Sequence, residues 1–149
     1  GFVGEIQAVN PTIINGLLKE GHIPIVSSIG ADDKGQAYNI NADTVASSLA
    51  AALEAKRILY LTDIEGLRAD MEDPESHISE ITSSDLQNLI DNGTISGGMI
   101  PKAQACLEAV EAGVGSAHMV DGRISHVILL ELFTDSGIGT MVLPDQEKK

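Results

Sequence analysis

The sequence predicts an α/β protein of one domain, built around a largely parallel sheet. Hydrophobic residues make up 43% of the 149 positions and aromatic residues only 3%, so the core must be aliphatic. Apolar runs of strand length alternate with segments of helical periodicity, and glycine-bearing turns separate them. Alternation of this kind is typical of parallel strands joined by crossover helices. The chain shows no internal repeat and no linker.

The first third of the chain is expected to hold a helix, a buried strand and a hairpin. Asn10 can cap a helix that has Pro11 at its first position, and Gly21 ends this helix. The run 23–29 has the composition of a buried strand, and the turn 32–35 suits the tip of a hairpin.

The remaining elements follow from caps, glycines and apolar spacing. A second helix begins near Asn41, with Val45, Leu49 and Leu53 on its inner face, and the strand 57–62 follows it and ends at Asp63. Beyond it we expect a solvated acidic loop at 68–77, a capping box at 84–87, a glycine-bearing loop at 93–98, a helix from Pro101 to Gly113, a strand at 117–120, a short helix after Asp121-Gly122 through Phe133, a last strand at 139–143 and a tail at 146–149.

Charge and cysteine content exclude several classes of partner. The net charge is −13, from 9 Lys and Arg against 22 Asp and Glu, so nucleic acids and anionic membranes are repelled. An anionic small substrate needs local cations and helix N-termini to outweigh this field. Cys106 is the single cysteine and cannot form an internal disulfide, and the chain has no signal peptide and no apolar run of membrane length. We therefore expect a cytosolic protein.

Asn39, Asn41 and Asp43 form the first polar group of interest. With Asn41 as the helix cap, Asp43 lies in the first turn, where the helix dipole favours a carboxylate. The pattern therefore suits an ordinary helix start. It equally suits a site in which Asn39 and Asn41 bind a ligand and Asp43 orients cationic groups beside it.

A second group, Thr62, Asp63 and Gly66, follows a predicted strand. Ligands of open α/β sheets bind at the carboxyl ends of the strands, so Thr62 and Asp63 are placed to meet a nucleotide. A plain turn that closes on Gly66 is the alternative.

The third group, Gly97 to Lys102, is the most informative. Pro101 at the first helical position puts Lys102 at the positive end of the helix dipole, where a cation is locally unfavourable. A broken local rule points to function. The Gly97-Gly98 loop also leaves free N–H groups for a phosphate.

Familiar ligand motifs are absent from the sequence. Walker A needs a lysine directly after its second glycine, and Gly113–Gly115 and Gly137–Gly139 each lack the third glycine of the dinucleotide fingerprint. The four histidines and one cysteine have no zinc spacing, so we expect no protein-bound metal centre.

Taken in order, these segments resemble the acetylglutamate kinase family over almost the whole chain. The matching text comprises Gly4-Glu5, Val9-Asn10, residues 21–24 and 39–43, Leu61-Thr62-Asp63 with Gly66, Gly98-Met99 with Pro101-Lys102, His126 through Glu131, and residues 137–140. The resemblance implies the amino-acid-kinase fold, a three-layer sandwich with a mainly parallel open sheet. Residues 1–149 would form its C-terminal, ATP-binding portion and lack its N-terminal part.

The resemblance also implies the chemistry. The ATP γ-phosphoryl group is transferred to the side-chain carboxylate of N-acetyl-L-glutamate, with Mg²⁺ bridging the phosphates. Lys102 would stabilise charge on the transferring phosphoryl group, Asp43 would organise the catalytic lysines, and Asn39 would contact the acetylglutamate. The residues that would line the ATP site are Thr62, Asp63, Gly66, Gly98 and Met99.

Parts of the family site are not found in these 149 residues. Family members carry, upstream, a second catalytic lysine, a Gly-Gly phosphate loop and an arginine that grips the substrate carboxylate. The chain opens at Gly1 without a methionine and reads as part of a longer protein. We expect the chain alone to bind nucleotide but to have negligible kinase activity, and the full-length enzyme to be a homo-oligomer.

Three alternatives stay open. The first is that the acceptor is that of a related carbamate, uridylate or aspartate kinase. The second is a regulatory site for L-arginine, because His126, Glu131, Gly137 and Gly139 resemble a segment that holds arginine in inhibited family members. Residues 127–130 would equally suit the core, with Glu131 on a solvated face. The third is an inert fragment with exposed apolar edges.

Overall fold

Residues 2–70, 73–135 and 137–145 are described in the computed structural model of the chain; the predicted tail at 146–149 lies outside them. The α-helices are α1 (Thr12–Lys19), α2 (Ala42–Ala52), α3 (Ser83–Asp91), α4 (Ile100–Glu111) and α5 (Val127–Phe133), with short 3₁₀ turns η1 (Pro74–Ser76) and η2 (Gly97–Met99). The strands are β1 (Ile29–Ala31), β2 (Ala37–Asn39), β3 (Ile58–Thr62), β4 (Leu67–Arg68), β5 (His77–Ile78), β6 (Glu80–Thr82), β7 (Ala117–Asp121) and β8 (Thr140–Leu143).

The central sheet has the strand order β3-β7-β8-β6. β3 pairs with β7 and β6 pairs with β8 in parallel, whereas β7 and β8 are antiparallel. Every residue of β7 is buried, as expected of a strand covered on both faces. The structure thus confirms the α/β class and the mainly parallel sheet.

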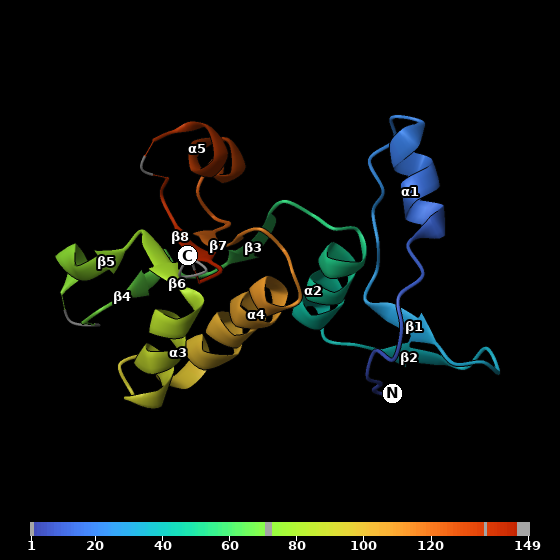
Figure 1. Cartoon of the computed structure of the whole chain (residues 1–149), viewed down its shortest axis with the longest axis horizontal. Coiled ribbons are helices and arrows are strands. Elements are labelled where there is room, and N and C mark those ends of the chain that lie inside the picture. Colours follow the sequence, from blue (N-terminus) through green and yellow to red (C-terminus); the bar gives the residue numbers. More distant parts are fainter. Residues whose placement is uncertain (1, 71–72, 136, 146–149) are drawn as a thin grey trace.

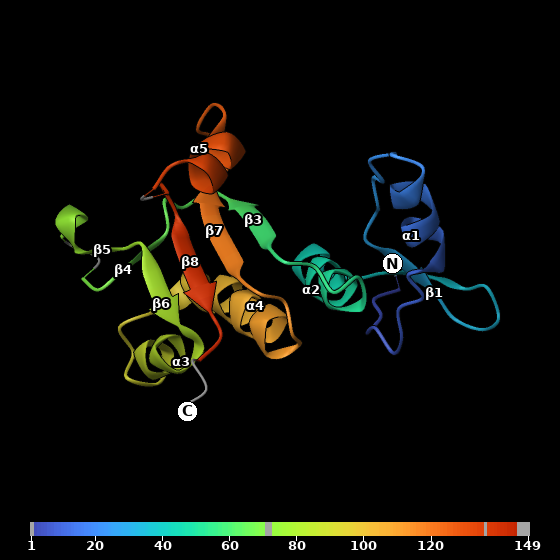
Figure 2. The same cartoon turned by 45° about the horizontal axis from the view of Figure 1, so that its top comes forward.

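Helices cover the sheet in layers. Figure 1 shows α3 and α4 on one side of the sheet and α5 on the other, and Figure 2 shows the strands from the face. α2 packs alongside α4 and reaches β3. The aliphatic core lies under α3 and α4, and its fully buried side chains include Leu67, Leu86, Ile95, Met119 and Val142. Among the described residues, no helix is long and apolar enough to cross a membrane.

Residues 2–40 lie to one side of this body (Figures 1 and 2). The helix expected after Asn10-Pro11 forms as α1, and the hairpin expected around residues 32–35 forms with Ile29 opposite Asn39. The buried strand predicted for 23–29 is wrong, because only Ile29 enters a strand. Ile23 and Ile25 are 92% and 98% exposed, and residues 23–27 make no backbone hydrogen bond to any described residue. The run has strand composition but no neighbouring strand within the described part of the chain.

Three smaller expectations also need correction. α3 is capped by Thr82, whose hydroxyl accepts from the Asp85 amide, so the cap lies two residues before the predicted Ser84. The loop expected at 68–77 is closed at its two ends by the short antiparallel pair β4–β5, with Arg68 opposite His77, and it includes the 3₁₀ turn η1. The buried residues of α2 are Ser47 and Ala50, not the apolar stripe starting at Val45, because α2 turns its small residues toward α4.

Candidate functional site

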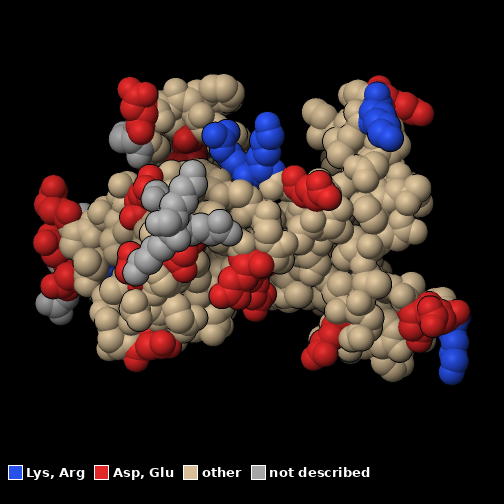
Figure 3. Space-filling view, in the orientation of Figure 1, with Lys and Arg blue, Asp and Glu red and all other residues tan. Residues whose placement is uncertain are grey.

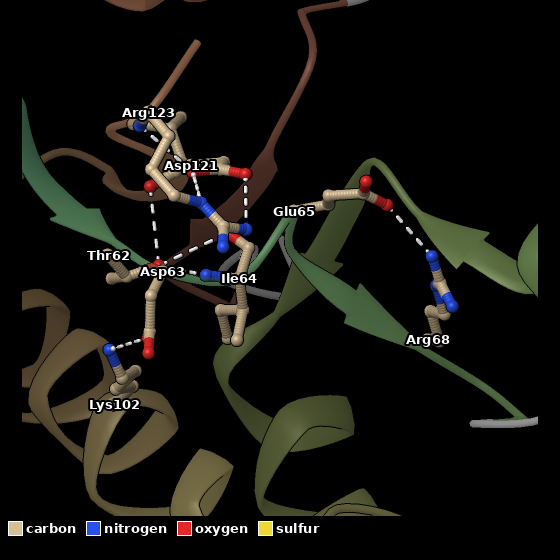
Figure 4. Close-up of polar contacts among 9 residues, drawn as sticks. Thr62, Asp63, Ile64, Glu65, Arg68, Lys102, Asp121 and Arg123 are labelled. Atoms are coloured by element: carbon tan, nitrogen blue, oxygen red, sulfur yellow. Dashed lines mark hydrogen bonds and ion pairs between the residues drawn. The ribbon is translucent and has the colours of Figure 1, made fainter.

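The carboxyl end of β3 and the amino end of α4 meet at a charged pair. β3 ends at Thr62, so Asp63 projects from the end of the strand, and Lys102 lies in the first turn of α4. Nζ of Lys102 lies 3.0 Å from Oδ1 of Asp63 (Figure 4). The hydrogen bond from Lys102 lowers the pKa of Asp63. The fold therefore joins the second and third groups that the sequence singled out.

This pair is open to solvent on the Asp63 side. The side chain of Asp63 is 77% exposed and that of Lys102 is 27% exposed. Exposed ion pairs contribute little net stability, so Lys102 can exchange Asp63 for a ligand anion at small cost. Asp63 also supplies the compensation for Lys102 at the helix N-terminus that the sequence did not reveal.

The approach to the amino end of α4 is unobstructed. η2 leads into α4, and the residue before the helix, Met99, provides no side-chain cap. Gly98 is exposed, and a Cβ placed on it would meet no atom within 4 Å. No side chain competes there for an anion, but the amides of Met99 and Ile100 already donate to the Ser96 and Gly97 carbonyls and Pro101 has no N–H, so Lys102 is the main anion-binding group at this end of α4. The Met99 side chain itself is buried in the core.

Thr62 and Gly66 shape the turn after β3. The Thr62 hydroxyl accepts from the Ile64 amide at 3.1 Å and lies 3.3 Å from the Val120 carbonyl. Gly66 has φ +132°, and a Cβ there would lie 2.7 Å from both His77 Nε2 and Thr140 Oγ1. Both residues thus hold the backbone that presents Asp63, in agreement with the turn that the sequence left open.

Asn41 caps α2, and Asp43 lies in the first turn of this helix, which packs against α4. Oδ1 of Asn41 accepts from the amides of Asp43 (2.9 Å) and Thr44 (3.1 Å). Burial, and after it the charge of Asp43, raises the pKa of Cys106 to about 12, so Cys106 is the buried structural thiol that its pattern indicates. Lys102 precedes Cys106 by one helical turn and shares its face of α4. Asp43 and Lys102 thus lie in the first turns of two helices that pack against each other.

Asn39 lies apart from this region in the described contacts. It sits in β2, where its amide donates to the Phe2 carbonyl at 2.9 Å and its carbonyl accepts from the Gly4 amide at 3.1 Å. Its side chain is exposed. Its assignment to the substrate stays a prediction.

A buried hydroxyl network ties α2, β3 and α4 together, and sequence reasoning missed it. The hydroxyls of Ser47 and Tyr60 lie 2.6 Å apart, Ser47 donates to the Asp43 carbonyl at 2.9 Å, and Tyr60 donates to the Ala105 carbonyl at 3.1 Å. Burial raises the pKa of Tyr60 to about 12. A tyrosine within an apolar strand was the available signal, because a buried hydroxyl needs a partner.

The sequence also gave no role to the ion pair at the end of β7. Asp121 lies opposite Thr62 in the sheet register. Arg123 donates to its two carboxylate oxygens from Nε and Nη2, each at 2.8 Å, and from its amide at 2.9 Å. These bonds hold the pKa of Asp121 at about 2. Figure 4 shows Arg123 on the side of Asp63 away from Lys102.

The residues predicted to hold arginine cluster around Glu131, but Glu131 is not solvated. Its side chain is 4% exposed, with Oε1 2.7 Å from Nδ1 of His118 and Oε2 accepting from the amides of Ile138 (2.8 Å) and Gly139 (3.0 Å). Burial opposes its charge, yet these hydrogen bonds outweigh it and lower the pKa of Glu131. The explanation of Glu131 as a solvated face is therefore wrong.

Its neighbours divide between the surface and the interior. His126 is exposed at the start of α5 with φ +62°, and a Cβ on Gly139 would clash with the Met119 carbonyl. Gly137 lines a surface cleft of about 380 Å³ with Glu65, Arg68, His77, Ser79, Ile124 and Ile138.

The distribution of charged side chains and of possible metal ligands limits which ligands these sites can bind. Figure 3 shows acidic side chains spread over the whole face, with Lys and Arg gathered at few places. Within the described ranges, no group of three or more His, Cys, Asp or Glu side chains is arranged to hold a metal ion.

Comparison with known proteins identifies the family of this chain. A sequence profile described as the amino acid kinase family matches residues 1–121. The chain is 50% identical over 145 residues to the acetylglutamate kinase of Desulforamulus reducens, covering 97% of this chain and 50% of the relative. It is 52% identical over 143 residues to that of Synechococcus sp. WH7803, covering 96% and 49%. The chain thus spans about half the length of the curated relatives it matches.

Solved structures show the same fold. The N-acetylglutamate synthase of Neisseria gonorrhoeae, complexed with coenzyme A and L-arginine, superposes with a TM-score of 0.84 at 24% identity, covering 96% of this chain and 32% of that one. The protein smu.665 of Streptococcus mutans gives a TM-score of 0.75 at 33% identity, covering 97% and 52%. The carbamate kinase of Giardia lamblia bound to AMP-PNP gives 0.65 at 21% identity, covering 90% and 44%.

Proposed function

The chain belongs to the amino acid kinase family, and we propose that it supplies the ATP-binding part of an acetylglutamate kinase. The reaction transfers the γ-phosphoryl group of ATP to the side-chain carboxylate of N-acetyl-L-glutamate and yields an acyl phosphate. This step belongs to arginine biosynthesis, which we place in the cytoplasm. The identity of about 50% to curated acetylglutamate kinases favours this acceptor over carbamate, uridylate or aspartate.

One observation carries the proposal: Lys102 and the uncapped amino end of α4 face the exposed Asp63 at the carboxyl end of β3. Triphosphate oxygens bind cations placed at helix N-termini, and the carboxyl ends of the strands are where ligands of open α/β sheets bind. In a chain of net charge −13, a cation that can leave its carboxylate partner for a phosphate is needed to hold ATP.

The residues have distinct parts in this reaction. Lys102 donates to the transferring phosphoryl group and balances the charge that spreads over its oxygens in the transition state. Gly98 lets the phosphates approach the backbone, and Asp63, Thr62, Gly66 and Met99 shape the rest of the ATP site. Asp43, on the neighbouring helix, orients the ammonium groups, and Asn39 and Asn41 are assigned to the acetylglutamate side.

Magnesium is expected with the nucleotide. Mg²⁺ in such sites is held largely by phosphate oxygens and water, with few protein carboxylates. The described part of the chain has no cluster of three ligating side chains, which fits an ion carried by ATP. When bound, the ion neutralises phosphate charge.

Activity is proposed to require more than these 149 residues, since the relatives are about twice as long. The test measures ADP release with N-acetyl-L-glutamate, carbamate, uridylate and aspartate as acceptors. The chain alone should turn over none of them. Joined to the half of the Desulforamulus reducens enzyme that it does not match, it should use N-acetyl-L-glutamate. Preference for another acceptor would overturn the assignment, and turnover by the chain alone would overturn the requirement.

A second, regulatory function is supported by the 380 Å³ cleft. Its lining holds the 2.8 Å pair of Glu65 and Arg68 with Gly137 and Ile138, so both charges needed to bind a free amino acid are present. We propose L-arginine as the effector, in an enzyme that is a homo-oligomer at full length. Calorimetric titration of the parent protein and of Arg68→Ala with L-arginine tests this proposal. Equal heats of binding in the parent and the variant would overturn it.

A further inference from the structure

The hydroxyl groups of Ser47 and Tyr60 form a buried pair to which the reaction described above gives no role. Their oxygens lie 2.6 Å apart, and the two residues are only 5% and 6% exposed. Ser47 belongs to α2 and Tyr60 to the centre of β3, and the Ala105 carbonyl of α4 lies 3.1 Å from the Tyr60 oxygen. The pair therefore connects three elements at one point.

The number of protons in this pair decides which bonds it can make. Each hydroxyl carries one proton, and an O–O separation of 2.6 Å requires that one of the two protons lies between the oxygens. When Tyr60 donates to Ser47, the serine proton goes to the Asp43 carbonyl at 2.9 Å. When Ser47 donates to Tyr60, the tyrosine proton goes to the Ala105 carbonyl at 3.1 Å. The second arrangement is a continuous hydrogen-bonded bridge from α2 through β3 to α4.

This bridge lies one helical turn from two residues of the candidate site. Ser47 follows Asp43 by four positions on α2, and each such pair shares one face of its helix. Ala105 likewise follows Lys102 by three positions on α4. The two helices pack against each other, and both begin at the carboxyl edge of the sheet, because each precedes one of the parallel strands β3 and β7. A change in the length of the bridge would therefore move the two first turns relative to each other.

The charge of Asp43 also reaches the bridge. Burial raises the pKa of Tyr60 and that of Cys106 to about 12, and the negative charge of Asp43 contributes to both increases. The Asp43 carboxylate therefore lies near both the bridge and α4. Since Tyr60 stays protonated at neutral pH, its hydroxyl is available as a donor there.

An apolar pair could fill the same space but would not fix a direction. Hydrogen bonds weaken steeply with distance and angle, so a satisfied buried pair specifies how its neighbouring elements pack. Phosphoryl transfer depends mainly on positioning and electrostatics, and a misplacement of about 1 Å can lower its rate about a hundredfold. The packing of α2 against α4 thus matters for a site built on both helices.

We propose that Ser47 and Tyr60 are positioning residues of the phosphoryl-transfer site. Their hydrogen-bonded hydroxyls hold the first turns of α2 and α4 at the spacing at which Asp43 orients the ammonium group of Lys102. The proposal rests on the proposed function, which gives Asp43 this orienting role. Both hydroxyls act through the two helices, without contact to substrate.

The kinetic test uses the 149-residue chain joined to the half of the Desulforamulus reducens enzyme that it does not match. Tyr60→Phe and Ser47→Ala each remove one hydroxyl and keep the rest of the packing. Each should lower kcat at least about tenfold and change the KM for ATP and for N-acetyl-L-glutamate by less than about twofold. The double variant should lose about as much kcat as either single variant, because the two hydroxyls act as one unit.

Ile81→Val is the control for a loss of stability alone. It removes one buried methyl group from β6, at the opposite edge of the central sheet from β3. It should lower the unfolding midpoint, as the hydroxyl variants do, and leave kcat unchanged.

The ¹³Cε resonance of Lys102 supplies a measurement that needs no turnover. It should shift in both hydroxyl variants and stay in place in Ile81→Val. A joined protein that phosphorylates none of the four acceptors would overturn the proposed function, and the resonance would still report on the spacing of the helices. An unchanged Lys102 resonance in Tyr60→Phe would overturn the positioning role. So would a raised KM at constant kcat, or a loss of kcat no larger than in Ile81→Val.

Discussion

Lys102 Nζ and Asp63 Oδ1 lie 3.0 Å apart although 39 positions separate them in the sequence. The contact joins the amino end of α4 to the carboxyl end of β3, and it brings two weak sequence signals to one place. Neither motif identifies a phosphate site alone. Together with the open approach over Gly98, they place an ammonium group beside a helix N-terminus on an acidic protein.

Alanine variants of Gly98 and Gly139 distinguish a loss of ATP binding from a loss of folding stability. Gly98→Ala should leave stability unchanged, because no atom lies within 4 Å of the added Cβ and its backbone is not left-handed. It should weaken ATP binding, since the methyl group lies where phosphate approaches the helix. Gly139→Ala should destabilise the fold by roughly 3 kcal/mol, because its Cβ meets the Met119 carbonyl. Urea unfolding and ATP titration of both variants check this; equal stability losses would contradict it.

Glu131 is expected to be a structural clamp. Glu131→Ala removes the acceptor for His118, Ile138 and Gly139 and leaves buried donors unpaired, which should cost about 3 kcal/mol. Glu111→Ala, an exposed change at the end of α4, should stay within about 0.5 kcal/mol of the parent. Denaturant midpoints distinguish this structural role of Glu131 from a role in effector binding alone. In the second case Glu131→Ala would retain full stability.

The lowered pKa of Asp121 predicts that the stability of the fold decreases at acidic pH. Its folded pKa of about 2 lies below the ordinary value of about 3.9, so its contribution to stability is fully present above about pH 5 and is lost as the pH falls through 4 toward 2. Asp121→Asn should remove this part of the acid dependence. Urea midpoints measured at pH 2, 3, 4 and 7 for both proteins check it; identical slopes between pH 4 and 2 would speak against it.

Local sequence rules predicted most of the elements. Asn41 forms the expected cap of α2, Pro101 lies in the first turn of α4 one residue after its start at Ile100, and the hairpin around residues 32–35 forms because its turn residues allow few alternatives. The same rules wrongly predict a buried strand at 23–29, because a strand also needs a neighbouring strand and none lies beside this run in the described part of the chain. The cap of α3 shifts to Thr82 because several hydroxyl residues compete there.

The candidate site was predictable as separate parts, and its assembly was not. The sequence singled out Thr62, Asp63 and Lys102 but contained nothing to show that Asp63 pairs with Lys102. The Tyr60–Ser47 bridge and the Asp121–Arg123 pair were missed because they depend on strand register and helix packing. The alternative of a solvated Glu131 fails because its partner His118 lies on another element, whereas a charged residue in a short apolar helix is usually exposed.

The most direct test of the nucleotide site is ATP binding to the 149-residue chain, measured by calorimetry with and without Mg²⁺. We expect binding that weakens about tenfold to a hundredfold in Lys102→Ala, the range for lost hydrogen bonds to charged groups. Asp63→Ala should weaken it as well, whereas Lys56→Ala, at an exposed residue before β3, should not. Absence of binding by a chain shown to be folded, or equal affinity in Lys102→Ala and the parent, would contradict the account.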